Sequence, residues 1–149
     1  IAFVPPEEGG PRLRVREVGV GGVDRVLVVD DSGITRRLVC MVLEGAGFEV
    51  GTAENGLEAL EKLYRGEWEL VIADVNMPMM DGVDLVRQVR EDPAYRGLPV
   101  VVLSSEAAGE RVRQALAAGA DLYLTKPVPP EMLVATVRAL LAGSRGCRR

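Results

Sequence analysis

Residues 26–32 read Val-Leu-Val-Val-Asp-Asp-Ser, and this short stretch decides the fold. Its four consecutive apolar residues, three of them β-branched, predict a strand that is buried on both faces. The run ends in two carboxylates, Asp30 and Asp31, and Ser32 is a suitable N-cap for a helix that begins at Gly33. A buried strand that passes directly into a helix is typical of α/β proteins, so we expect this unit to recur along the chain.

The strand–helix unit recurs four more times. Apolar or alternating segments predict the further strands at 48–52, 70–73, 99–103 and 122–124. Amphipathic segments predict helices at 33–45, 57–63, 81–89, 110–118 and 129–141, of which the last is expected to end at Gly143. Five strands alternating with five helices predict a single doubly wound α/β fold, in which a parallel sheet carries helices on both faces.

The first helix carries four apolar residues at the spacing of one helix face. These residues are Ile34, Leu38, Met41 and Val42. Because side chains on one face of a helix can all contact the same sheet, we expect this row to be the apolar face of the helix.

The two ends of the chain differ from this body. Eight of the residues in 1–24 are Pro or Gly, which predicts a linker or N-terminal extension; a short strand around Leu13 and Val15 is the alternative. Residues 25–142 form the expected domain, and the arginine-containing segment 143–149 is expected to be a short basic tail.

Composition excludes several classes of function. Histidine is absent, which excludes Ser-His and Cys-His catalytic pairs, histidine-ligated zinc and a phosphohistidine of the protein's own. Cys40 and Cys147 lie far apart in the sequence, so we expect neither a disulfide scaffold nor a structural zinc site, which suits a cytoplasmic protein. The net charge of −4 does not favour nucleic-acid binding, and no apolar run is long enough for a membrane helix.

Side chains that can do chemistry follow four of the predicted strands. Asp30 and Asp31 end the first strand, Asp74 the third and Ser104 the fourth, while Lys126 follows the fifth. Lysine is rare here, with two residues against sixteen arginines, so a lysine at the end of an apolar strand is notable. Because the carboxyl ends of parallel strands meet at one edge of a sheet, we expect these groups to converge in one crevice.

The chemistry of such a cluster can be derived from its groups. Three carboxylates repel one another unless a cation intervenes, and Mg²⁺ binds one or two carboxylates together with waters and a phosphate oxygen. A carboxylate can then attack phosphorus and form an acyl phosphate, while a lysine and a hydroxyl hold the oxygens of the transferred group. These residues therefore predict a phosphoryl-transfer site that needs no histidine.

The motifs resemble the receiver domain of two-component response regulators, and most closely its stand-alone chemotaxis (CheY-like) type. The matching stretches, all near the carboxyl ends of predicted strands, are 28–32 (Val-Val-Asp-Asp-Ser), 74–82 (Asp-Val-Asn-Met-Pro-Met-Met-Asp-Gly), 103–107 (Leu-Ser-Ser-Glu-Ala) and 119–127 (Gly-Ala-Asp-Leu-Tyr-Leu-Thr-Lys-Pro). The resemblance covers residues 26–142 and implies a five-stranded flavodoxin-like sheet with strand order 2-1-3-4-5.

The resemblance implies a role for each group of the cluster. Asp74 matches the phosphoacceptor, and Asp30, Asp31, Asp74 and the backbone carbonyl of Asn76 match the ligands of Mg²⁺. Lys126 matches the residue that contacts the phosphoryl group, and the peptide bond that follows it is expected to be cis.

The resemblance also implies how a signal would leave the site. Ser104 matches the residue whose hydroxyl moves to bind the attached phosphoryl group. Tyr123 matches the aromatic residue that swings inward when that hydroxyl moves. The alternative for Tyr123 is that it only packs against its neighbours. That movement would reshape the face formed by the helix at 110–118, the strand at 122–124 and the last helix, where partners bind. Asn76 and Glu106 match positions that tune the hydrolysis of the acyl phosphate.

A phosphorylation-activated switch is the leading functional hypothesis. Because the chain has no histidine, the phosphoryl group must come from the phosphohistidine of a partner histidine kinase or phosphotransfer protein. No output domain follows Gly143, so we expect signalling by protein contact or through a preceding segment, without nucleic acid or membrane.

Three other functions remain open. The chain could be the receiver part of a hybrid kinase or larger regulator, which the start at Ile1 favours modestly. An aspartate-nucleophile phosphohydrolase would need a second Asp two residues after its nucleophile, and Ser32 stands there instead. An unphosphorylated interaction scaffold would usually lack one of the acids or the lysine. We therefore expect a phosphoacceptor switch rather than an enzyme with an external substrate.

Overall fold

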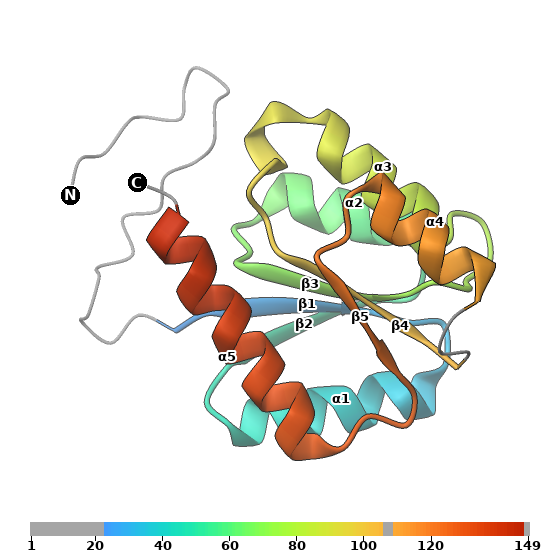
Figure 1. Cartoon of the computed structure of the whole chain (residues 1–149). Coiled ribbons are helices and arrows are strands. Elements are labelled where there is room, and N and C mark those ends of the chain that lie inside the picture. The colour runs from blue at the N-terminus through green and yellow to red at the C-terminus, as the bar shows by residue number, and fades with distance from the viewer. Residues whose placement is uncertain (1–22, 106–108, 148–149) are drawn as a thin grey trace.

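The short apolar strands form the centre of the molecule, as the computed structural model shows (Figure 1). Their bounds are β1 Arg25–Val29, β2 Glu49–Ala53, β3 Leu70–Asp74, β4 Val100–Ser104 and β5 Leu122–Thr125. All four pairings are parallel, and the strands lie in the order β2-β1-β3-β4-β5. The predicted fold class and strand order are confirmed.

The structure describes residues 23–105 and 109–147, with side chains as far as residue 144. Nearly all of the expected N-terminal linker, the alternative strand around Leu13 and Val15, and the last two residues of the expected tail lie outside this range. Glu106, the second of the two expected tuning residues, also lies outside it.

The helices cover both faces of the sheet. They are α1 Gly33–Gly45, α2 Gly56–Arg65, α3 Gly82–Glu91, α4 Glu110–Ala118 and α5 Pro130–Cys147, with a short 3₁₀ helix, η2, at Pro93–Tyr95. In Figure 1, α1 and α5 lie on one side of the sheet and α2, α3 and α4 on the other. No helix within the described residues is both long and apolar enough to span a bilayer.

Two details of the helices differ from the sequence-based expectation. The 3₁₀ helix was not predicted, and α5 does not end at Gly143 but continues to Cys147. A glycine inside a helix costs about 1 kcal/mol relative to alanine, yet it keeps its backbone N–H and carbonyl. Gly143 therefore weakens the helix without ending it, and part of the expected basic tail is helical.

Alternate residues of each central strand enter two separate apolar clusters. On β1, Leu27 and Val29 belong to the cluster under α2, α3 and α4, whereas Val26 and Val28 belong to the cluster under α1 and α5. The same alternation continues on β3 and β4, all of whose residues are buried. Burial on both faces explains why these strands are almost continuously apolar.

The apolar face predicted for α1 is wrong for three of its four residues, and only Val42 packs against the core. Ile34, Leu38 and Met41 have exposed fractions of 73%, 56% and 61%, whereas Val39 and Leu43 are buried against the sheet. The helix has apolar residues on both faces, so periodicity alone could not identify the buried one.

The first three helices begin at side-chain caps. Ser32, Asn55 and Asp81 each accept a hydrogen bond from the backbone N–H three residues further on, at 3.3, 2.9 and 3.0 Å. The cap predicted at Ser32 is confirmed. Because α1 starts four residues after β1 and α2 starts three residues after β2, the caps at Ser32 and Asn55 lie close to the carboxyl edge of the sheet.

The two leucines of α1 allow a matched test of its orientation. We expect Leu43→Ala to lower the free energy of unfolding by about 2–4 kcal/mol, because it leaves a cavity in a packed cluster. Leu38→Ala should cost less than about 1 kcal/mol, since its side chain is mostly exposed. Urea denaturation of dilute protein measures both values, and equal losses would contradict the orientation of α1.

Candidate functional site

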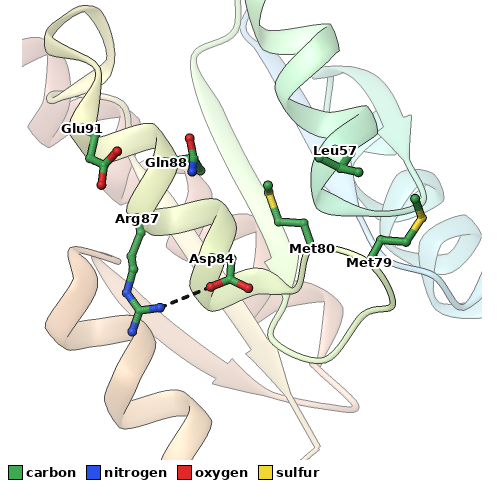
Figure 2. A pocket seen from close by; sticks show the side chains of 7 residues that line it. All are labelled: Leu57, Met79, Met80, Asp84, Arg87, Gln88 and Glu91. Atoms are coloured by element: carbon green, nitrogen blue, oxygen red, sulfur yellow. Dashed lines mark hydrogen bonds and ion pairs between the residues drawn. The ribbon is translucent and has the colours of Figure 1, made fainter.

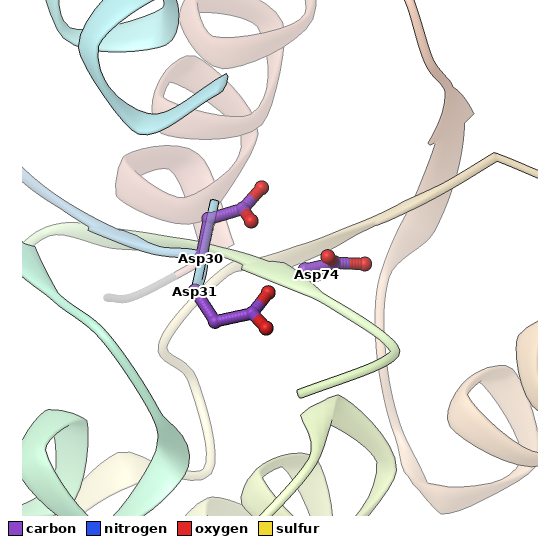
Figure 3. Close-up of side chains that lie close together, drawn as sticks. All are labelled: Asp30, Asp31 and Asp74. Carbon is purple, nitrogen blue, oxygen red and sulfur yellow. The ribbon is translucent and has the colours of Figure 1, made fainter. Parts of the chain in front are cut away.

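Three carboxylates gather at the carboxyl edge of the two central strands. Asp30 and Asp31 directly follow β1, and Asp74 is the last residue of β3, which pairs with β1. Each contributes an oxygen to a group whose members all lie within 4.8 Å of one another, and Figure 3 shows the three side chains close together at the ends of their strands. Asp30 and Asp74 are buried and Asp31 is exposed, so the cluster is open to solvent on one side.

Lys126 joins the two buried carboxylates. Its Nζ lies 3.0 Å from Oδ2 of Asp74 and 3.1 Å from Oδ2 of Asp30. The backbone N–H of Lys126 donates to the carbonyl of Ser104 at 2.8 Å, which holds the lysine beside the end of β4. The Lys126–Pro127 peptide bond is cis, as the resemblance implied.

The second oxygen of each buried carboxylate accepts a hydrogen bond from a backbone N–H group. Ser32 donates to Oδ1 of Asp30 at 2.9 Å, and Asn76 donates to Oδ1 of Asp74 at 3.2 Å. Each carboxylate therefore has one oxygen toward a backbone donor and the other toward Lys126, which fixes its orientation.

Charge repulsion and burial shape the proton affinities in the cluster. Burial raises the pKa of Asp74 above its ordinary value, and the neighbouring Asp30 adds to this, although the hydrogen bonds from Lys126 and Asn76 oppose it. Burial alone would lower the pKa of Lys126, but its hydrogen bonds and charge interactions with Asp74 and Asp30 outweigh this and raise that pKa.

The donor set suits a hard divalent cation. Three ionised carboxylates and one ammonium leave two negative charges in a partly buried place. Oxygen ligands from one or two carboxylates, completed by water, are what Mg²⁺ prefers. Asp31 is the exposed member, so an ion can reach the cluster from solvent.

The two residues expected to relay a signal lie next to the cluster. Ser104 ends β4, adjacent to β3, and is buried. Tyr123 pairs with Val102 in the sheet, is half-buried, and packs against the cluster under α2, α3 and α4. Their movements remain predictions. Asn76 is exposed and contacts Asp74 through its N–H; the role of its carbonyl also remains a prediction.

Sequence reasoning missed two arginines near the site. Arg36 of α1 donates to the backbone carbonyl of Asp30 at 2.6 Å, and Arg111 of α4 forms an ion pair with Asp81, the cap of α3. The sequence contains no signal for either contact, because one acceptor is a backbone carbonyl and the other lies 30 residues from its donor. Arg111 links the loop after Asp74 to α4.

A shallow pocket of about 330 Å³ lies beside the site, between α2 and α3 (Figure 2). Met79 and Met80 enter it from the loop after β3, and Leu57 from the start of α2. Its other wall is the polar side of α3, formed by Asp84, Arg87, Gln88 and Glu91.

A model of the "Response regulator receiver domain" family matches residues 26–138. The chain belongs to this family. The receiver domain is 39% identical over 119 residues to the chemotaxis protein CheY1 of Helicobacter pylori, covering 78% of this chain and 96% of that protein. Members of the family act as signalling switches rather than as enzymes with external substrates, so the expected functional class is confirmed at this level.

Two solved structures show the same fold. A response regulator from Chloroflexus aurantiacus matches with a TM-score of 0.78 and 36% sequence identity. The match covers 80% of this chain and 98% of that chain. The receiver domain of a histidine kinase from Syntrophus aciditrophicus has a TM-score of 0.77 at 33% identity, with 85% of this chain and 94% of that chain covered.

Gly82 allows a test of how closely α3 must approach the site. Its N–H donates to the carbonyl of Val75 at 3.1 Å, and a Cβ there would collide with the backbone carbonyl of Asp74. We expect Gly82→Ala to lower the free energy of unfolding by about 1–3 kcal/mol. Thermal and urea denaturation measure the loss.

Gly143 is the matched control. Among the described residues, no atom of a neighbouring group lies within 4 Å of a Cβ placed there, and the residue is inside α5. Gly143→Ala should therefore raise the free energy of unfolding by about 0.5–1 kcal/mol. A stabilised Gly82→Ala variant would contradict the close approach of α3 to Asp74.

Proposed function

We propose that this receiver domain is a switch that is phosphorylated on Asp74 by a partner protein. The observation that carries the proposal is the position of the Lys126 ammonium between Asp30 and Asp74. An ordinary surface ion pair joins one acid to one base. Here the ammonium of Lys126 contacts two buried carboxylates, and the carboxylate of Asp31 lies beside them. Because the cluster has an excess of negative charge, it would accept a phosphoryl group only together with a cation such as Mg²⁺, and the Lys126 ammonium could then contact that group.

The donor is a histidine kinase or a phosphotransfer protein that carries phosphohistidine. In the transfer, the phosphorus–nitrogen bond of the donor breaks and a bond forms between phosphorus and a carboxylate oxygen of Asp74. The donor's imidazole, protonated on its other ring nitrogen, keeps the electron pair of the broken bond and leaves in its neutral form, and Asp74 becomes an acyl phosphate. Hydrolysis of that acyl phosphate by water would restore the carboxylate and release phosphate.

The other residues of the cluster have distinct parts in this proposal. Asp30, Asp31, Asp74 and the carbonyl of Asn76 would hold Mg²⁺, which, when bound, offsets the charge of the phosphoryl oxygens. Lys126 would contact the attached phosphoryl group. Asn76 and Glu106 would tune its hydrolysis.

The signal would leave the site through β4 and β5. Ser104 would donate its hydroxyl to the attached phosphoryl group, and Tyr123 would follow it inward. The face formed by α4, β5 and α5 would then bind a downstream protein. The receiver domain from a histidine kinase with the same fold supports the alternative that this chain works as a part of a larger regulator.

Magnesium should stabilise the folded protein. A ligand present at 100 times its dissociation constant adds about 2.7 kcal/mol, which corresponds to a rise in Tm of several degrees for a domain of this size. Asp30→Ala should remove most of that rise, whereas Asp84→Ala on the exposed side of α3 should keep it. Thermal denaturation with and without MgCl₂ measures the effect, and an equal rise in both variants would contradict the site.

A small phosphodonor tests the proposed acceptor directly. With acetyl phosphate and Mg²⁺, we expect the intact mass to increase by one phosphoryl group, and hydroxylamine to remove it, because an acyl phosphate reacts with this nucleophile. Asp74→Asn should show no labelling, and Asp84→Asn should be labelled like the wild type. Labelling of Asp74→Asn at the wild-type level would identify another acceptor.

A further inference from the structure

Arg36 occupies an unfavourable place for a cation. It is the fourth residue of α1, and the positive end of the helix dipole disfavours a positive charge in the first turn. Its side chain is nevertheless mostly buried, with an exposed fraction of 20%. Specific contacts of the guanidinium therefore have to compensate for this position.

The guanidinium of Arg36 is held by two acceptors at the ends of neighbouring strands. Its Nη1 donates to the backbone carbonyl of Asp30 at 2.6 Å, and its Nη2 lies 3.7 Å from a carboxylate oxygen of Glu54, which follows β2. The N–H of Asp30 donates to the carbonyl of Ala53 at 3.0 Å, so the two strand ends also meet through the backbone. Arg36 thus links the loop after β1 to the loop after β2.

The two acids that follow β1 are oriented in different ways. The carboxylate of Asp30 has contacts of its own, with the N–H of Ser32 and the ammonium of Lys126. The carboxylate of Asp31 is exposed, and no residue in the described part of the chain donates a hydrogen bond to it. Its direction therefore depends on the backbone from which the side chain leaves.

We propose that Arg36 is a positioning residue of the magnesium site, an inference that rests on the proposed function. The carbonyl of Asp30 and the nitrogen of Asp31 belong to one planar peptide group, so a donor that fixes the carbonyl also fixes the plane. Arg36 supplies that donor and thereby limits the directions in which the Asp31 carboxylate can point. It acts on the arrangement of the two acids and does not itself contact the ion.

The choice of metal ion separates an effect of positioning from an effect of charge. Mg²⁺ requires nearly ideal octahedral geometry at short distances, whereas Ca²⁺ accepts irregular geometry and longer distances. Loss of positioning should therefore weaken the binding of Mg²⁺ more than that of Ca²⁺. Loss of a nearby positive charge should instead strengthen the binding of both ions to a similar extent, since both carry two positive charges.

A titration of the full chain with MgCl₂ or CaCl₂, followed by amide NMR and without a phosphodonor, tests the proposal. We expect Arg36→Met to weaken Mg²⁺ binding about tenfold and Ca²⁺ binding by less than about threefold. Arg36→Lys keeps the charge and a donor, so it should restore most of the Mg²⁺ binding. The matched control is Arg37→Met, which removes the same charge from the next, exposed residue and should bind both ions at least as tightly as the wild type.

Glu54→Gln provides a second variant that should leave the fold intact, because the Glu54 side chain has an exposed fraction of 68%. It weakens the second contact of the Arg36 guanidinium and should shift the preference from Mg²⁺ toward Ca²⁺ by about twofold. If the NMR spectrum shows that Arg36→Met is unfolded, this variant decides the question, and an unchanged preference would then overturn the proposal.

Failure of the positioning role and failure of the proposed function give different results. A wild type that does not bind Mg²⁺ would overturn both. A wild type that binds Mg²⁺, together with an Arg36→Met variant that binds it equally well or better, would overturn the positioning role alone. Equal weakening of both ions in Arg36→Met, or the same loss in Arg37→Met, would also overturn it, since neither result follows from the geometry at Asp31.

Discussion

The burial of the central strands on both faces is the constraint on which the rest of the structure depends. Every residue of β3 and β4 is buried, and alternate residues of β1 enter two different apolar clusters. A polar side chain in the middle of such a strand would lack water and partners. Polar chemistry is therefore confined to the strand ends, where Asp30, Asp74 and Ser104 are found.

The same constraint explains how the site is held. The buried carboxylates of Asp30 and Asp74 need compensation, and each receives one backbone N–H and shares the ammonium of Lys126. The cluster still has an excess of negative charge, and burial raises the pKa of Asp74. This donor set suits a divalent cation, as the proposed function requires, and the fold holds the carboxylates in place through these contacts.

Much of this arrangement could be predicted from the sequence, because it depends on short-range patterns. Apolar runs that end in acidic residues predicted the strands and the positions of the three carboxylates. The position of Ser32 before an amphipathic segment predicted that it caps a helix. The convergence of Lys126 with the carboxylates was also expected, but two other long-range contacts could not be predicted. Arg111 meets Asp81 across 30 residues, and Arg36 binds a backbone carbonyl, so neither contact has a sequence signature.

By itself, the sequence determined the fold class, the identity of the acidic groups and the edge of the sheet at which they stand, since hydrophobic periodicity and strand ends are local properties. Only the tertiary structure decided which face of α1 is buried, because Val39 and Leu43 compete with Ile34, Leu38 and Met41 for the sheet. It also decided that the ammonium of Lys126 lies between Asp30 and Asp74, since that distance depends on how β1, β3 and β5 are placed across the sheet. Ile34, Leu38 and Met41 remain exposed because Val39 and Leu43 make the contact between α1 and the sheet.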